Sequence, residues 1–201
     1  MDWDDFSATV GIELQKTTGR SVCSGVLLRP HVVLTAAHCL VDLISARVTN
    51  DEAMSTAQSW HVARDWQTHP NYRGNLPGQS VDVGLIFLSS ELNDVAYAEH
   101  APYQPGEMCE RVGFGERSGR NVRTWLTAFP QALQGSSLKV QDAYGRLGDS
   151  GGPVYQNHAN GLRLIGVHTG REYGQQGQLN DISFVQLLTP EIWAWVRSKV
   201  H

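Results

Sequence analysis

Residues 148–153 have the sequence GDSGGP, in which a serine stands among glycines. Glycines flank the hydroxyl of Ser150, so no neighbouring Cβ atom blocks the approach of a substrate carbonyl. The same glycines leave backbone amides free to point at one spot, where they can hold a developing oxyanion. Taken alone, such a run is as often an ordinary loop, and a nucleophilic serine requires a base beside it.

Two other short motifs supply candidates for that base and for its partner. Residues 35–39 read TAAHC and place His38 at the end of an apolar strand. Residues 80–86 read SVDVGLI and place Asp82 within an apolar segment, where a carboxylate is costly to bury unless something pairs with it. Each motif alone has an ordinary structural explanation. Their conjunction favours a catalytic site made of His38, Asp82 and Ser150.

Short apolar segments separated by single glycines run along the chain, and 20 glycines in 201 residues favour many tight turns. One helix is predicted at the C-terminal end, because Thr189 suits the N-cap and Pro190 the first helical position. The remaining pattern is that of an all-β protein. The predicted strands are Thr9–Gln15, Ser24–Leu28, Val32–Thr35, Val81–Leu88, Arg111–Gly115, Leu138–Asp142, Gly152–Tyr155, Leu162–His168 and Ile182–Leu188.

Composition excludes several classes of protein. With 41% hydrophobic and 18% charged residues and a net charge of −4, the chain is typical of a globular protein without a basic nucleic-acid-binding surface. The longest apolar run, Val83–Leu88, is far shorter than the about 20 residues that a membrane helix needs. We therefore expect neither nucleic acid nor a membrane as a partner.

Together the three motifs resemble the signature sequences of the chymotrypsin and trypsin family of serine proteases. The resemblance implies two six-stranded antiparallel β-barrels and a C-terminal α-helix, over residues 1–100, 101–188 and 189–201. It implies a serine endopeptidase that cleaves protein or peptide substrates through an acyl-enzyme, and we expect a monomer that uses no cofactor. No His or Cys pair has the spacing of a zinc site, so we expect no metal, with a calcium-binding loop as the alternative. In this mechanism His38 takes the proton of Ser150, and Asp82 orients His38. The backbone amides of Gly148 and Ser150 form the oxyanion hole.

Three cysteines allow at most one internal disulfide, and composition alone does not choose the pair. The resemblance implies a bridge between Cys23 and Cys39. It leaves Cys109 unpaired, because Gln156 occupies the position of its usual partner. The N-terminal sequence contains no export signal, so the protein either stays inside its cell or has lost one. A bridge favours a secreted or periplasmic protein, and two reduced thiols in a cytosolic protein are the alternative.

The resemblance leaves the route of activation open. In the trypsin-like branch, the residue matching Asp149 pairs with an N-terminal ammonium that is released by cleavage before an Ile-Val-Gly-Gly sequence. No such sequence occurs in this chain. Either Asp149 has an internal donor or the site is an unactivated, zymogen-like form. A catalytically silent binding module on the same fold is the alternative function, since a fold alone does not establish activity.

The expected substrate pocket differs from that of trypsin. Tyr144 stands where trypsin-like enzymes carry an acidic residue at the bottom of the pocket, which disfavours a preference for Arg or Lys. The segment Gly166–Arg171 is expected to line the pocket, with Thr169, Gly170 and Arg171 as substrate-binding residues. Thr169 matches a family serine whose hydroxyl approaches the aspartate of the triad.

His168 is the residue from which we expect specificity. It matches the histidine by which glutamate-specific relatives bind a carboxylate, and Arg146 and Arg171 add positive charge nearby. This predicts a preference for acidic residues before the scissile bond. Two alternatives stay open: His168 merely fills the pocket wall, or Asp181 reaches the pocket and favours a cation.

Overall fold

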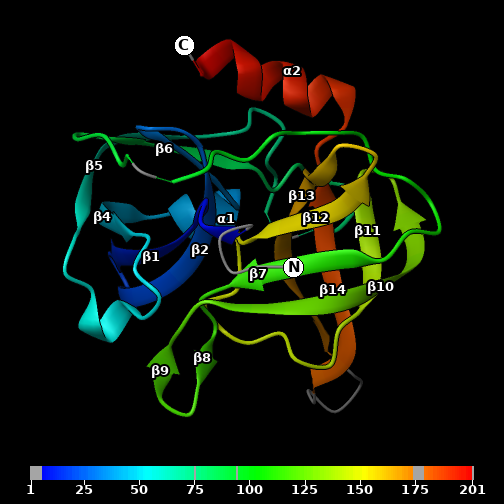
Figure 1. Ribbon diagram of the computed structural model, residues 1–201, viewed down its shortest axis with the longest axis horizontal. Coiled ribbons are helices and arrows are strands. Elements are labelled where there is room, and N and C mark those ends of the chain that lie inside the picture. Colours follow the sequence, from blue (N-terminus) through cyan, green and yellow to red (C-terminus); the bar gives the residue numbers. More distant parts are fainter. Residues whose placement is uncertain (1–5, 75, 94, 174–178, 201) are drawn as a thin grey trace.

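The two halves of the chain form two closed, six-stranded antiparallel barrels that lie side by side (Figure 1). This computed structural model describes residues 6–74, 76–93, 95–173 and 179–200. The outermost limits of the predicted domains, residues 1 and 201, lie outside these described ranges. The prediction of an all-β, chymotrypsin-like fold with a C-terminal helix is confirmed.

The first barrel is built from the segments that flank the His and Asp motifs. Pairing of β1 with β2 and of β1 with β4 closes it, and its β3 is completely buried because all four residues are apolar or β-branched. The strands in spatial order are β1 (Thr9–Lys16), β2 (Gly19–Arg29), β3 (Val32–Thr35), β6 (Gly84–Leu88), β5 (His61–Thr68) and β4 (Leu43–Thr49).

The second barrel surrounds the serine motif. Its β12 begins at the proline of GDSGGP, and pairing of β7 with both β10 and β12 closes the barrel. The strands in spatial order are β10 (Thr124–Gln134), β11 (Ser137–Gln141), β14 (Leu179–Leu187), β13 (Gly161–Tyr173), β12 (Pro153–His158) and β7 (Cys109–Gly113).

The C-terminal helix α2 (Pro190–Lys199) follows the second barrel and packs on the first (Figure 1). The side chain of Thr189 accepts a hydrogen bond from the amide of Ile192, which is the expected N-cap. Ile192 and Val196 are buried in an apolar cluster that contains most of the first barrel's core and also Leu164 and Val167 of β13. Each such burial contributes roughly 1.5 to 3 kcal/mol to stability. Because α2 follows the second barrel in the chain, this burial stabilises the contact between the two barrels.

Four short elements lie outside the barrels. The helix α1 (Ala37–Leu40) follows β3, and the 3₁₀ turn η2 (Met54–Thr56) lies between β4 and β5. The strands β8 (Glu116–Arg117) and β9 (Arg120–Asn121) form a small hairpin after β7. These elements place loops of both barrels around one site.

The cores of the two barrels differ in kind. The apolar cluster of the first barrel includes Val10, Ile12, Val33 and Leu85, all completely buried. The second barrel has a smaller apolar cluster, and the side chain of Arg111 is buried at 1% exposure. A buried guanidinium requires carboxylate partners, and these lie next to the serine motif.

Several predicted strand boundaries were wrong. The strand patterns of β4, β5 and β10 were missed because most of their side chains are exposed or half-buried, which weakens the apolar alternation. The predicted strand from Val81 begins at Gly84, so Asp82 precedes β6 rather than lying within it. The predicted strand Arg111–Gly115 is Cys109–Gly113.

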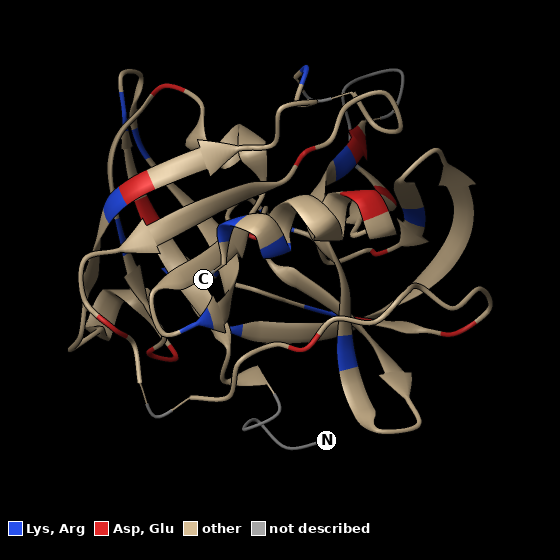
Figure 2. Cartoon of the chain, turned by 90° about the horizontal axis from the view of Figure 1, so that it is seen from above, with Lys and Arg blue, Asp and Glu red and all other residues tan. Residues whose placement is uncertain are grey.

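Charged residues are spread over both barrels (Figure 2). The two helices that the structure describes are short, and none of the described helices is long and apolar enough to cross a membrane.

Candidate active site

His38 and Asp82 meet in the first barrel although they are far apart in sequence. His38 lies in α1, and the Nδ1 atom of its ring is 2.7 Å from Oδ2 of Asp82. The backbone amide of His38 donates to Oδ1 of the same carboxylate at 2.8 Å. Asp82 therefore holds both the ring and the backbone of His38, which leaves Nε2 as the free ring nitrogen.

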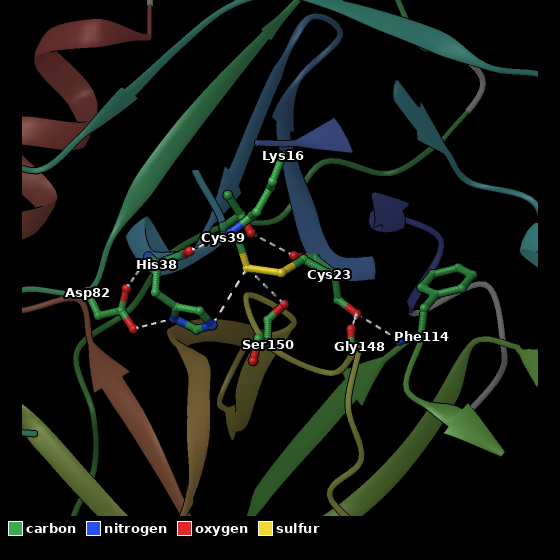
Figure 3. Close-up of a disulfide and its surroundings, with 10 residues drawn as sticks. Lys16, Cys23, His38, Cys39, Asp82, Phe114, Gly148 and Ser150 are labelled. Atoms are coloured by element: carbon green, nitrogen blue, oxygen red, sulfur yellow. Dashed lines mark hydrogen bonds and ion pairs between the residues drawn. A yellow bond between two sulfur atoms is a disulfide. The ribbon is translucent and has the colours of Figure 1, made fainter. Parts of the chain in front are cut away.

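Ser150 comes from the loop between β11 and β12 of the second barrel and lies beside the ring of His38 (Figure 3). Its carbonyl accepts a hydrogen bond of 2.7 Å from the amide of Ser24 in β2, which joins the loop to the first barrel. Within the described residues, no hydrogen bond joins the Ser150 hydroxyl to Nε2. Such bonds often form only when a substrate is bound.

The disulfide between Cys23 and Cys39 borders the same site, as Figure 3 shows. The Sγ atom of Cys39 is 3.8 Å from Nε2 of His38 and 3.8 Å from the carbonyl oxygen of Ser150. The predicted pairing is confirmed, and the bridge connects β2 to the helix that carries His38.

The amides of the serine loop divide into two groups. Asp149, Gly151 and Gly152 donate to carbonyls of Arg146, His168 and Asp149, at 3.1, 2.7 and 3.0 Å. The amides of Gly148 and Ser150 donate to no group that the structure describes. Gly148 has φ +100°, in the left-handed region that favours glycine.

A cavity of about 470 Å³ opens beside Ser150. The sequence-predicted residues that line it are His38, Ser150, His168, Thr169, Gly170 and Arg171. The others are Glu116, Gly145, Arg146, Leu147 and Tyr173. Tyr144, which was expected at the bottom of the pocket, is 61% exposed and does not line this cavity.

His168 lies at the buried wall of the cavity, with 2% of its surface exposed. Both ring nitrogens are buried and have no hydrogen-bond partner among the described residues. Burial, reinforced by the nearby charge of Arg111, lowers the pKa of His168 to about 4 despite the carboxylates of Asp149 and Asp142. The imidazole is therefore neutral near pH 7.

The other expected specificity residues have different surroundings. The hydroxyl of Thr169, which was expected to approach Asp82, donates to the carbonyl of Phe184 at 3.3 Å. The backbone amide of Asp82 donates to Oε1 of Gln186. The side chain of Asp181 is 68% exposed and lies 4.0 Å from Nη2 of Arg171. Asp181 does not line the cavity.

A buried ionic cluster behind the serine loop was missed by sequence reasoning. Arg111 lies 2.7 Å from Oδ2 of Asp142 through Nε and 2.9 Å from Oδ2 of Asp149 through Nη1. Arg117 of β8 adds a contact of 3.1 Å to the same oxygen of Asp149. The signal that could have revealed the cluster is Arg111 itself, a charged residue in a predicted strand, where a charge needs a partner if it is buried.

Opposite charges decide the ionisation of these two carboxyl groups. Burial alone would raise the pKa of Asp142, but Arg111 and hydrogen bonds lower it to about 2. Burial opposes ionisation of Asp149 as well, yet Arg111 and Arg117 help to lower the pKa of Asp149. Both groups are carboxylates near neutral pH, so the serine loop is anchored by charge.

Cys109 is a free, buried thiol in β7, as predicted. Burial raises its pKa to about 12, so the thiol is un-ionised and unreactive near neutral pH. Gln156, at the position of the missing partner, is buried and hydrogen-bonds to Gln104 and to the carbonyl of Glu107.

The chain is similar in sequence to known serine proteases. The family model described as Trypsin matches residues 5–195. Duodenase-1 of Bos taurus is 27% identical over 188 residues, with 78% of this chain and 74% of the relative covered. Trypsin of Saccharopolyspora erythraea is 26% identical over 186 residues, with 78% of each covered.

Two further relatives extend the comparison. Cathepsin G of Homo sapiens is 28% identical over 187 residues, with 79% of this chain and 72% of the relative covered. A solved structure of HL collagenase superposes with a TM-score of 0.79 at 17% identity, covering 97% of this chain and 94% of that one. The structural likeness supports the fold alone.

Proposed function

The chain belongs to the trypsin family of serine proteases, and from this premise we propose that Ser150, His38 and Asp82 hydrolyse peptide bonds through an acyl-enzyme. The observation that carries the proposal is the contact of 2.7 Å between Nδ1 of His38 and Oδ2 of Asp82. It leaves Nε2 free at the edge of the cavity that Ser150 also lines.

The chemical steps follow from these positions. His38 accepts the hydroxyl proton of Ser150 through Nε2 as the oxygen attacks the scissile carbonyl. Asp82 fixes the tautomer of His38 and stabilises the imidazolium that forms. His38 then gives the proton to the leaving amine, and water attacks the acyl-enzyme by the reverse sequence.

The oxyanion of the tetrahedral intermediate needs donors that are already in position. The amides of Gly148 and Ser150 are suited to this role, because the neighbouring amides of Asp149 and Gly151 already donate to the carbonyls of Arg146 and His168. Losing one donor of this kind typically costs about 10²- to 10³-fold in rate. We assign the oxyanion hole to these two amides.

For the substrate, we propose a preference for acidic residues before the scissile bond. His168 lines the cavity and its buried ring nitrogens have no hydrogen-bond partner among the described residues, and an unsatisfied buried polar group costs roughly 1 to 3 kcal/mol. A substrate carboxylate supplies the acceptor. Arg146 and Arg171 outnumber Glu116 among the charged lining residues, which favours an anionic side chain.

The first experiment is labelling with a fluorophosphonate followed by peptide mass spectrometry. We expect one modified residue, Ser150, because the reagent requires a working nucleophile and oxyanion hole. Unlabelled wild-type protein would favour the alternative of a catalytically silent binding module.

The second experiment is cleavage profiling of a peptide library with the wild type and with His168→Val. The variant should lose about 10- to 150-fold in kcat/KM for a glutamyl substrate, the worth of a hydrogen bond to a charged group. It should lose little for an apolar one. A wild-type preference for large apolar residues would leave His168 as pocket wall, and one for Arg or Lys would contradict the acidic preference.

We also propose that the protein works in an oxidising compartment, secreted or periplasmic. The Cys23–Cys39 bridge supports this location, since disulfides persist outside the reducing cytosol. Protein or peptide substrates suit the exposed cavity, and we propose that the enzyme acts as a monomer.

A further inference from the structure

The hairpin of β8 and β9 carries an arginine that reaches into the serine loop. Arg117 donates from Nη1 to the carbonyl of Gly115 at 2.9 Å and from Nη2 to the carbonyl of Tyr144 at 3.2 Å. The same Nη2 lies 3.1 Å from Oδ2 of Asp149. Its side chain is 23% exposed, so it joins the surface of the hairpin to a completely buried carboxylate.

Asp149 is held on every side by groups of its own chain. Its Oδ1 accepts a hydrogen bond of 2.7 Å from the amide of Gly115, and its Oδ2 accepts one of 2.9 Å from the amide of Arg146. A Cβ at Gly113 would lie 2.5 Å from Oδ1, and one at Gly115 would lie 2.6 Å from the carboxylate. The carboxylate of Asp149 therefore occupies space that is open only because residues 113 and 115 are glycines.

The charge of Arg111 alone does not balance the buried carboxylates around it. The fork of Arg111 is shared by two buried carboxylates, Asp142 and Asp149. Arg111 alone would leave one buried negative charge without compensation, which is strongly destabilising. Arg117 supplies the second positive charge, and the neutral ring of His168 does not supply one.

The carboxylate sits one residue before the nucleophile, so its position sets the direction of the neighbouring amides. With Asp149 turned inward, the amides of Gly148 and Ser150 stay free of internal acceptors. A loop in which Asp149 swings out would change the backbone at both amides. The anchoring charges therefore act on the oxyanion hole through one peptide unit on each side.

We propose that Arg117 is a positioning residue, which together with Arg111 neutralises the buried carboxylates and so builds the oxyanion hole without an ammonium group from a cleaved N-terminus. This inference rests on the proposed function of Ser150 as the nucleophile. It makes the hairpin of β8 and β9 part of the catalytic apparatus.

The test compares Arg117→Ala with Arg120→Ala. Arg120 is the matched control, because it pairs with Arg117 across the hairpin and its side chain is exposed. We expect Arg117→Ala to lower kcat and the rate of fluorophosphonate labelling by about 10- to 100-fold, with KM little changed. Arg120→Ala should behave as the wild type.

Rescue separates positioning from stability. Arg117→Lys should recover part of the lost kcat, and added ethylguanidinium should recover part of it in Arg117→Ala, with no effect on Arg120→Ala. Each measurement is made without denaturant, at a temperature where the circular dichroism spectrum of the variant matches that of the wild type. A loss of kcat that neither the lysine nor the guanidinium recovers overturns the positioning role.

A second arm tests independence from the N-terminus. Protein bearing an uncleaved N-terminal extension should match the kcat/KM of protein from which the extension has been removed. Activity only after removal overturns the inference, as does equal labelling of wild type and Arg117→Ala. If the wild type itself is not labelled at Ser150, the proposed function fails first, and the two failures are thereby distinguished.

Discussion

The two barrels bring their catalytic groups to the cleft by different physical means. The first barrel holds His38 through one carboxylate and a disulfide, over a core of aliphatic side chains. The second barrel holds the Ser150 loop through a buried ionic cluster centred on Arg111. One half of the site therefore depends on a covalent bridge and the other on balanced charge.

The largest expected effect tests whether the two barrels act as one unit. Ser150→Ala and His38→Ala should each lower kcat/KM by at least about 10⁴-fold, because each removes a member of the same proton-transfer chain. Steady-state kinetics of the double variant should match the single variants. A double variant far below both would mean that the barrels contribute independently.

Next in size is the loss of the buried cation in the second barrel. Arg111→Met should lower the free energy of unfolding by about 3 to 5 kcal/mol, because two buried carboxylates lose their main partner. Urea denaturation measures this. The matched control is Arg47→Met, which breaks a largely exposed pair with Glu13 and should cost less than about 1 kcal/mol.

An equal loss in the two arginine variants would contradict the view that charge anchors the second barrel. A stable Arg111→Met variant with full activity would contradict it as well, since the serine loop would then be held by other contacts.

Removing the covalent bridge tests the first barrel. The double variant Cys23→Ala/Cys39→Ala opens a link between residues 16 positions apart, and we expect a loss of about 3 kcal/mol in the free energy of unfolding. Mass measurement of the non-reduced wild type should show one disulfide. Cys109, which is buried with its pKa raised to about 12, should react with iodoacetamide only after denaturation.

A bridge that includes Cys109, or a double variant as stable as the wild type, would remove the distinction between a covalently held barrel and an ionic one.

The smallest effect concerns pH and the neutral imidazole above the ionic cluster. The folded pKa of His168 is about 4, against about 6.5 when unfolded, so the unfolded state binds a proton first as pH falls. This contribution to stability is complete above pH 6.5 and is lost between pH 6.5 and 4. By pH 4.5 most of this contribution has been lost, a decrease of about 2 to 3 kcal/mol by linkage.

Urea denaturation of wild type and His168→Val at pH 7.5 and 4.5 measures this term. On acidification the variant should lose less stability than the wild type, by about 2 to 3 kcal/mol. Asp142 and Asp149 have lowered pKa values, so their contributions are lost below this range, as pH falls from about 4 toward 2. Identical pH dependence in both proteins would show that His168 is accessible to protons in the folded state.

The fold class and the residues that meet in the first barrel could be predicted from the amino-acid sequence. Short motifs carried the chemistry, β-branched and apolar runs marked buried strands such as β1 and β3, and Thr189 with Pro190 marked the start of α2. These signals are local, because a cap, a strand period or a glycine-flanked serine depends on neighbours within a few residues. The catalytic roles of His38, Asp82 and Ser150 stay predictions until labelling tests them.

The side chains that surround the serine loop could be identified only from the tertiary structure. Arg111, Arg117, Asp142 and Asp149 come from separate segments, and the closing of the second barrel brings them together. No local pattern shows that the charge of Arg111 is divided between two carboxylates, or that the ring of His168 has no hydrogen-bond partner in the described part of the chain. Charge balance in a buried site depends on the distances between side chains, and these exist only once the barrel is closed.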